Sequence, residues 1–200
     1  MKKHYRDEAI IQGRKKQKRI QDLDIKTLVH IQGMEYEFER ISLFDNAFSI
    51  LLPKTFYLMD ERTAKVKYPM ESRPQLIYTE NKNEINFTFS ISKELPGPDG
   101  QEQETMDGIK AVIKRMNPTV VFEKEQVLCL DEHENKKVVC MDFVAPALDA
   151  DVYYYYFIFY IETRGLMLGI FNCPEAGKKE WKIVIPQVVE SVNFLRNQVN

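Results

Sequence analysis

The chain has 200 residues, of which 44% are apolar and 29% are charged, and this composition excludes a disordered or fibrous protein. Its length suffices for one domain that folds around its own core without a disulfide framework or a metal. The net charge of −2 excludes a general electrostatic attraction to nucleic acid or to anionic membranes.

The N-terminal segment differs in charge from the rest of the chain. Residues 1–20 carry eight basic and two acidic side chains, and their apolar residues are too sparse for a packing stripe. We therefore expect a basic, partly helical arm over 1–33 and a single α+β domain over 34–200. No apolar stretch has the length of a signal-sequence core or of a membrane-spanning helix, so we expect a cytoplasmic protein that does not insert into membranes.

The arm contains a basic run whose charge density suits contact with the phosphates of a polyanion through counterion release. No aromatic side chain interrupts this run, so binding to a specific nucleic acid is not expected. A solvated helix face is the simpler interpretation and is favoured over polyanion binding. The residues that would contact a polyanion are Arg14, Lys15, Lys16, Lys18 and Arg19.

From Met34 onward the apolar pattern has a period of two, which is typical of strands with one buried face. It predicts a first pair of antiparallel strands, of which the second covers 48–52. A turn-rich loop follows at 68–74. After it, residues 75–79 and 84–92 predict a further hairpin.

The middle of the chain predicts one helix followed by two strands. Apolar residues recur at helical spacing over 104–116, and an Asn-Pro step ends this helix. Residues 119–130 and 137–144 then predict two strands that a polar turn joins.

The clearest hairpin lies in the C-terminal third of the chain. Residues 153–161 and 166–173 predict strands on either side of a turn that ends in Gly165, as in a type I turn followed by a bulge. The closing segment has apolar residues at helical spacing over 181–195. It predicts a helix in which Pro186 marks a start or a kink.

These elements predict an α+β fold with a mostly antiparallel sheet of about six to eight strands. The strand at 153–161 is apolar on both sides, so both faces of the sheet need cover. We therefore expect helices on both faces.

The order of the elements resembles the Mog1/PsbP-like fold, an α/β/α sandwich that the bacterial DcrB-like proteins share. The resemblance covers roughly residues 46–196 and rests on the strand 48–53, the helix 104–116, the hairpin 153–173 and the closing segment 185–194. The family's usual proline-glycine-aromatic step after the opening strand is replaced by Pro-Lys-Thr-Phe. The resemblance implies binding to a partner rather than catalysis.

The sequence lacks the patterns of several catalytic and cofactor-binding classes. Its eight glycines are scattered, so no phosphate-binding loop is expected, and neither GxGxxG nor GxSxG occurs. Asp149 and Asp151 read as part of a solvated loop rather than as an acid/base pair. We expect no enzymatic activity and no cofactor.

A metal site or an activated thiol would have to involve the predicted hairpin over 119–144. With its turn centred near 134–135, Cys129 is expected opposite Cys140, while His133 lies in the turn. Zinc prefers four ligands at short spacings, so no metal is expected. Buried, inert thiols are favoured over nucleophiles.

The loop at 68–74 is the first candidate surface for binding another protein. Tyr68, Met70 and Arg73 lie in or beside a segment bounded by two prolines, and rigid loops on a scaffold often carry function. A plain connection between elements is the simpler interpretation of this loop.

The aromatic tract at 153–157 is the second candidate surface. Alternate residues of a strand face opposite sides of the sheet, and core packing is favoured for both sets. If one set is exposed, Tyr153 and Tyr155 are the candidates for partner binding.

The favoured function is a non-enzymatic protein-interaction module of the adaptor or chaperone type. Its partner is another protein of open identity, and a homodimer is also left open. The alternative is a small-molecule-binding protein, or an unrecognised enzyme, with a pocket between the sheet and a helix.

Overall fold

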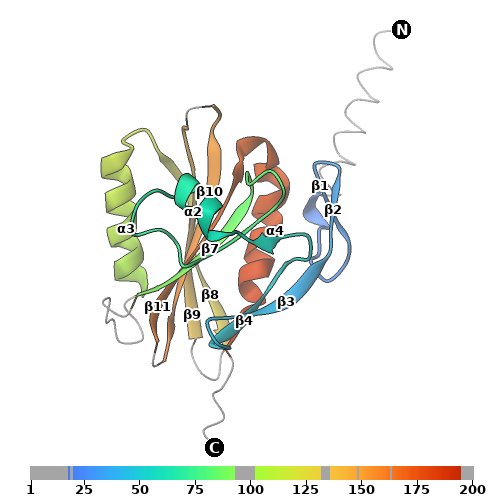
Figure 1. Cartoon of the computed structure of the whole chain (residues 1–200), viewed down its shortest axis with the longest axis horizontal. Helices are drawn as coiled ribbons and strands as arrows, with labels where there is room; N and C mark the ends of the chain where they lie inside the picture. The colour runs from blue at the N-terminus through green and yellow to red at the C-terminus, as the bar shows by residue number, and fades with distance from the viewer. Residues whose placement is uncertain are drawn as a thin grey trace, which may run out of the picture.

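The computed structural model describes residue 18 and residues 20–92, 102–131, 136–147, 149–162 and 164–194 (Figure 1). No helix in this part of the chain is long and apolar enough to cross a membrane. In chain order the elements are β1 (Val29–Ile31), β2 (Met34–Tyr36), β3 (Phe38–Leu43), β4 (Phe48–Pro53), β5 (Tyr57–Leu58), α2 (Glu61–Lys67), β6 (Leu76–Thr79), β7 (Asn86–Ser92), α3 (Glu102–Met116), β8 (Val121–Asp131), β9 (Lys136–Ala145), β10 (Val152–Ile161), β11 (Gly165–Pro174), the short 3₁₀ helix η1 (Glu175–Gly177), α4 (Lys178–Glu190) and β12 (Asn193–Phe194).

Seven strands form one sheet in the spatial order β5-β6-β7-β11-β10-β9-β8. Every neighbouring pair in it is antiparallel. The predicted antiparallel sheet of six to eight strands is therefore confirmed. β8 forms one edge of this sheet and the two-residue β5 forms the other.

The hairpin of β10 and β11 was the clearest feature of the sequence, and the structure contains it. The two strands pair along their whole length, from Val152 opposite Pro174 to Ile161 opposite Gly165. The turn ends on Gly165 with a φ of 102°, a backbone conformation that favours glycine. The amide of Arg164 donates to the carbonyl of Ile161 at 3.1 Å and closes the turn.

One face of the large sheet carries α4 together with the N-terminal strands. Apolar residues of α4 pack there against aromatic residues of the sheet and against β4, which pairs with β3 and β12 in a separate three-stranded sheet. Strands therefore contribute to this layer beside the helix. The largest buried side chains in it are Trp181, Tyr153, Phe48, Phe87, Phe89, Phe157, Phe159 and Phe171.

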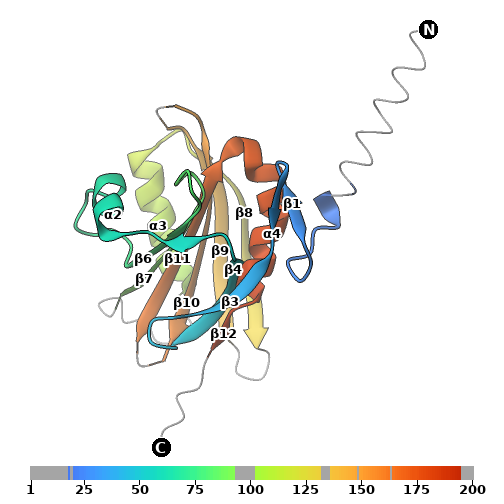
Figure 2. The same cartoon turned by 45° about the vertical axis from the view of Figure 1, so that its right-hand side comes forward.

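The opposite face carries α3 and α2 (Figure 2). Met106 of α3 is 1% exposed and packs with Met141 of β9, whereas the neighbouring Cys140 belongs to the cluster beneath α4. Adjacent residues of β9 thus face different helices, as the alternation of a strand requires. α2 is anchored on this face by Ala64, which packs near Ile77 of β6.

The folded body begins earlier than the expected boundary between residues 33 and 34. That boundary falls inside the β1–β2 hairpin, and Ile25, Val29 and Ile31 are buried in the core beneath α4. Polar contacts also fix this segment, because Gln187 of α4 accepts from the Ile25 amide at 3.2 Å. Val29 and Ile31 therefore pack through a hairpin rather than through a helix stripe.

The closing helix ends earlier than the predicted span of 181–195. α4 stops at Glu190, and the chain then pairs β12 with β4, so Phe194 lies opposite Phe48. Ser191 at the helix end provides the reason, since its hydroxyl accepts from the amide of Leu51 at 2.9 Å. Pro186, expected at a start or a kink, lies inside α4.

Candidate interaction surface

The short helix α2 follows directly on the edge strand β5. Its first turn is capped by Asp60, which accepts from the Thr63 amide at 3.0 Å and from the Thr63 hydroxyl at 2.6 Å. Ala64 is 8% exposed and packs with Met59 and Ile77, so one face of the helix is fixed on the sheet. The opposite face points to solvent.

Four large apolar side chains within residues 57–70, in and beside this helix and strand, are exposed, and we call them the α2 surface. The side chains and their exposed fractions are Tyr57 (42%), Leu58 (53%), Val66 (80%) and Met70 (71%). Ten large apolar side chains are exposed in the described part of the chain, and four of them therefore fall within residues 57–70.

Polar contacts hold β5 and α2 against the turn between β6 and β7. The hydroxyl of Tyr57 donates to Asn83 Oδ1 at 3.4 Å, and the ammonium of Lys67 donates to the Asn83 carbonyl and to Asn86 Oδ1 at 3.1 Å. Burial lowers the pKa of Lys67, although Glu80 and Glu84 act in the opposite direction. The α2 surface is thus presented on a braced scaffold rather than on a loose loop.

The structure divides the predicted loop residues among different environments. Met70 is exposed, whereas Tyr68 and Arg73 are half-buried. The amide of Arg73 donates to the Met70 carbonyl at 3.2 Å, which makes a compact turn. The sequence analysis did not identify Val66 or the β5 residues Tyr57 and Leu58, because a seven-residue helix is too short to show a periodic pattern. The signal in the sequence that could have indicated the helix was its capping residue, Asp60.

Tyr153 and Tyr155 are not exposed, so the condition under which they were candidates for partner binding is not met. They are 0% and 4% exposed beneath α4, as the favoured core interpretation requires. The hydroxyl of Tyr153 donates to Asp142 Oδ2 at 3.0 Å, and that of Tyr155 accepts from Gln126 at 2.8 Å. Both rings therefore belong to the interior.

A network of charges that the sequence did not reveal lies where α4 meets β8 and β9. Lys182 contacts Asp142 Oδ2 and Glu123 Oε2, each at 2.8 Å, and Lys178 pairs with Glu123 as well. Burial lowers the pKa of Lys182, but the two carboxylates outweigh it and raise that pKa overall. Asp142 is 1% exposed, and its second oxygen, Oδ1, has no hydrogen-bond partner. The charges balance within the network, so it pins the helix to the sheet.

The cysteines do not form a reactive centre. Burial raises the pKa of Cys140 and that of Cys173 to about 12, which disfavours the thiolate. Cys129 is exposed and pairs with Lys137, whereas Gln126 lies opposite Cys140, so the expected pairing of the two cysteines was wrong. The difference is already two residues next to the turn, where Asp131 lies opposite Lys136, and the register shift between Cys129 and Asp131 adds one more.

The remaining polar residues considered as catalytic, metal-binding or polyanion-binding candidates do not come together in one site. Asp149 and Asp151 are both exposed, and so is Lys18. Within the described ranges, no group of three or more His, Cys, Asp or Glu side chains is placed to hold a metal ion. The other predicted polyanion contacts, Arg14, Lys15, Lys16 and Arg19, lie outside the described residues, as does His133.

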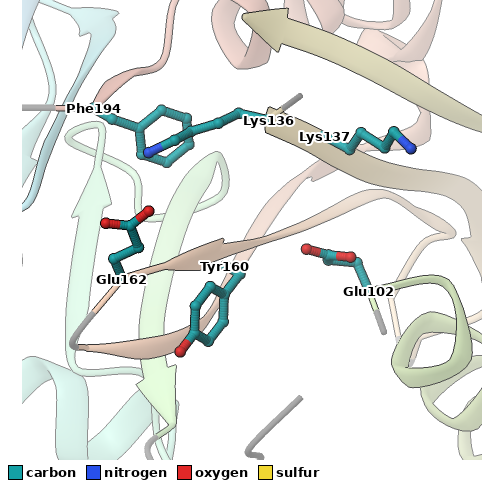
Figure 3. A pocket seen from close by; sticks show the side chains of 6 residues that line it. All are labelled: Glu102, Lys136, Lys137, Tyr160, Glu162 and Phe194. Carbon is teal, nitrogen blue, oxygen red and sulfur yellow. The ribbon is translucent and has the colours of Figure 1, made fainter. Parts of the chain in front are cut away.

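Figure 3 shows a small pocket at the end of the sheet where β9, β10 and β12 meet the start of α3. Its cavity volume of about 10 Å³ is the space of roughly one water molecule, which is too little for a metabolite. The ammonium of Lys136 lies 4.4 Å from the centre of the Phe194 ring and covers one side. The pocket is lined by Glu102, Lys136, Lys137, Tyr160, Glu162 and Phe194.

Comparison with known proteins shows a shared fold. No family model and no curated protein matches the chain. Among solved structures, PsbP from the cyanobacterium Synechocystis sp. PCC 6803 matches at a TM-score of 0.52 with 12% identity, covering 79% of this chain and 92% of that one. The Ran-binding protein Mog1p of Saccharomyces cerevisiae matches at a TM-score of 0.49 with 9% identity, covering 80% and 96%. The chain thus has the Mog1/PsbP-like fold, as the order of its elements suggested.

Proposed function

We propose that the protein is a non-enzymatic interaction module, of the adaptor or chaperone type, that binds a partner protein through the α2 surface. The observation that carries the proposal is that four of the ten exposed large apolar side chains among the described residues, Tyr57, Leu58, Val66 and Met70, fall within residues 57–70, beside the edge strand β5. Burial of these side chains by a partner would remove apolar surface from water, which favours association.

The chemistry of the α2 surface supports a protein as the partner. Met70 is flexible and polarisable, so it adapts to different contact surfaces. Tyr57 offers an apolar ring with a polar end, a combination enriched at interfaces. Because Ala64 and Lys67 fix α2 on the scaffold, little ordering entropy would be lost on binding.

The non-enzymatic part of the proposal is supported by the buried thiols, whose raised pKa values disfavour nucleophilic attack. The proposal also places the protein in the cytoplasm, because all three cysteines are free and thiols persist in that reducing compartment.

Affinity capture with matched variants tests the proposal. Val66→Glu/Met70→Glu charges the α2 surface, whereas Val112→Glu/Met116→Glu changes the same residue types, with the same spacing, on α3. Val112 and Met116 are 44% and 79% exposed, so both double variants should fold.

Captured proteins are quantified from lysate of the source cell for the wild type and both variants, with circular dichroism as the check of folding. We expect at least one captured protein to fall about tenfold with the α2 variant and to remain unchanged with the α3 variant, since central apolar contacts dominate binding. Equal capture by the two variants would reject the α2 surface.

A further inference from the structure

The strand β8 is an open edge of the large sheet. It extends over eleven residues, and among the described strands it pairs with β9 alone. The strand at the opposite edge, β5, has only two residues. An unpaired edge presents backbone amides and carbonyls that can bond to another strand. β8 is therefore the edge at which the sheet can be extended over a useful length.

The regular part of this edge lies in the middle of β8. The ladder with β9 has one register shift just before Lys124 and another just after Cys129, and residues 124–129 pair without a break between them. Such irregularities bend a strand and locally end its pairing. Residues 124–129 contain no proline, which would remove a hydrogen-bond donor. A further strand would therefore bond to this run.

The side chains of the run leave apolar area in water. Val127 is 53% exposed and lies opposite Val139, whose side chain packs in the cluster beneath α3. Cys129 is exposed on the same face, because it follows Val127 by two residues. On the other face, Leu128 is half-buried against the cluster beneath α4. A strand beside β8 would cover Val127 and remove its apolar area from water.

We propose that β8 pairs with β8 of a second copy of this chain, antiparallel and about a twofold axis at Val127, which joins the two large sheets into one. Directly opposite residues of such a pair lie on the same face of the joined sheet. Val127 therefore lies opposite Val127 of the second copy, and the two side chains cover each other. The same strand is used from both copies, so the assembly closes as a dimer. The interface lies at the edge of the sheet away from β5 and the α2 surface, so it is separate from the proposed function.

Charge complementarity supports a second copy as the occupant. With the axis at Val127, Glu125 lies opposite Cys129 of the second copy, and Lys137 follows in the same row, because Cys129 pairs with Lys137 within each protomer. Lys137 is exposed, and the small thiol between them lets the long side chains of Glu125 and Lys137 approach each other. The symmetry makes this contact twice. Glu125 also pairs with Lys110 of its own protomer, so it lies between two cations.

Other registers of the same strand pair are less favourable. An axis at Lys124 or at Glu125 places two like charges directly opposite each other, which is destabilising. An axis at Gln126 places Glu125 opposite Val127, and the next residue in that row is the buried Val139, which offers no cation. An axis beyond Val127 shortens the paired part of the run. The axis at Val127 therefore combines the longest regular pairing with opposite charges.

Sedimentation velocity of the full chain over a range of concentrations tests the dimer. We expect a species of twice the mass of the chain, whose fraction grows with concentration. Val127→Lys places two like charges at the axis and should weaken the dimer about tenfold or more. Val66→Lys, at an exposed position of α2, should leave it unchanged, and circular dichroism checks the folding of both variants. A chain that stays monomeric at every concentration, or a dimer that the two variants affect equally, would overturn the inference.

A disulfide trap tests the register. Directly opposite residues of an antiparallel pair have Cα atoms about 5 Å apart, which suits a disulfide. Val127→Cys combined with Cys129→Ser should therefore give a covalent dimer on mild oxidation. The unchanged chain is the control, because the two copies of Cys129 would lie about 14 Å apart along the strands, too far for a disulfide. No covalent dimer from the Val127→Cys variant, or an equal yield from the unchanged chain, would contradict the axis at Val127.

Discussion

Asp142 of β9 accepts a hydrogen bond from the hydroxyl of Tyr153 in β10, at 3.0 Å, at a site where the aspartate is only 1% exposed. The same oxygen lies 2.8 Å from the ammonium of Lys182 in α4. A buried carboxylate is stable only while such partners compensate its charge. This contact therefore couples the helix to the centre of the sheet.

Removing the cation should destabilise the protein strongly. Lys182→Met leaves Asp142 buried without its charged partner, and we expect a loss of about 3 kcal/mol in the free energy of unfolding. Lys179→Met, at an exposed position of the same helix, should change it by less than about 0.5 kcal/mol. Urea unfolding at pH 7 measures both values. Equal stabilities of the two variants would show that the ion pair is not structural.

The same network predicts a pH dependence on the acid side. Burial alone would raise the pKa of Glu123, but Lys178 and Lys182 outweigh it and hold the pKa below the usual value of 4.5. Because the Glu123 carboxyl has a lower pKa in the folded than in the unfolded protein, it stabilises the fold fully at pH values above its unfolded-state pKa. This stabilisation is lost as the pH falls through the folded-state pKa.

Glu123→Gln should therefore lower the free energy of unfolding at pH 7. The variant should also lose less of this free energy than the wild type when the pH falls from 7 to below 4.5. Glu61→Gln is the control, because Glu61 also pairs with a lysine but is exposed, where ion pairs contribute little. The urea midpoint as a function of pH is the measurement. If the urea midpoint of Glu123→Gln falls with decreasing pH in the same way as that of the wild type, the stabilising role of the Glu123 carboxylate is contradicted.

Gly169 of β11 has no room for a side chain. A Cβ atom there would lie 2.1 Å from Cζ of Phe157, its partner in β10. Gly169→Ala should force the buried Phe157 ring to move and destabilise the protein by about 1–3 kcal/mol, as overpacking of a core does. Gly108→Ala in α3 meets no atom within 4 Å and should be neutral or stabilising. Thermal unfolding compares the two, and similar melting temperatures would refute the close approach.

The three thiols should differ in reactivity. Alkylation of the native protein at pH 7 should modify the exposed Cys129 and leave Cys140 and Cys173 protected, since both are buried and have a raised pKa. Mass spectrometry of peptides after timed iodoacetamide treatment gives the rates, and urea-unfolded protein gives the reference. Rapid native labelling of either buried thiol would reopen a catalytic interpretation.

Local sequence patterns correctly predicted the helices and strands that depend on interactions between residues close together in the chain. The β10–β11 hairpin followed from alternation together with Gly165, and α3 followed from helical spacing. The predicted partner of Cys129 was wrong because the residue types show neither where the strands on either side of the turn begin to pair nor the register shift between Cys129 and Asp131. The predicted end of the closing helix was wrong because Val188, Val192 and Leu195 follow helical spacing in the sequence, whereas residues 193–194 pair with the distant strand β4.

The candidate surfaces were predictable only in part. The loop containing Met70 was found from its composition, but alternation could not tell whether Tyr153 and Tyr155 face a helix or solvent. That depends on α4 and β4, which pack there from distant parts of the chain. Tyr154 and Tyr156, on the other side of the same strand, proved to be the half-exposed pair.

The α2 surface is the central claim, and site-specific photo-crosslinking in cells tests it most directly. A benzophenone amino acid is placed at Met70, in the α2 surface, or at Met116, which is similarly exposed on α3. We predict a discrete crosslinked protein from position 70 and none from position 116. Crosslinks of equal yield and identity from both positions, or none from position 70, would contradict it.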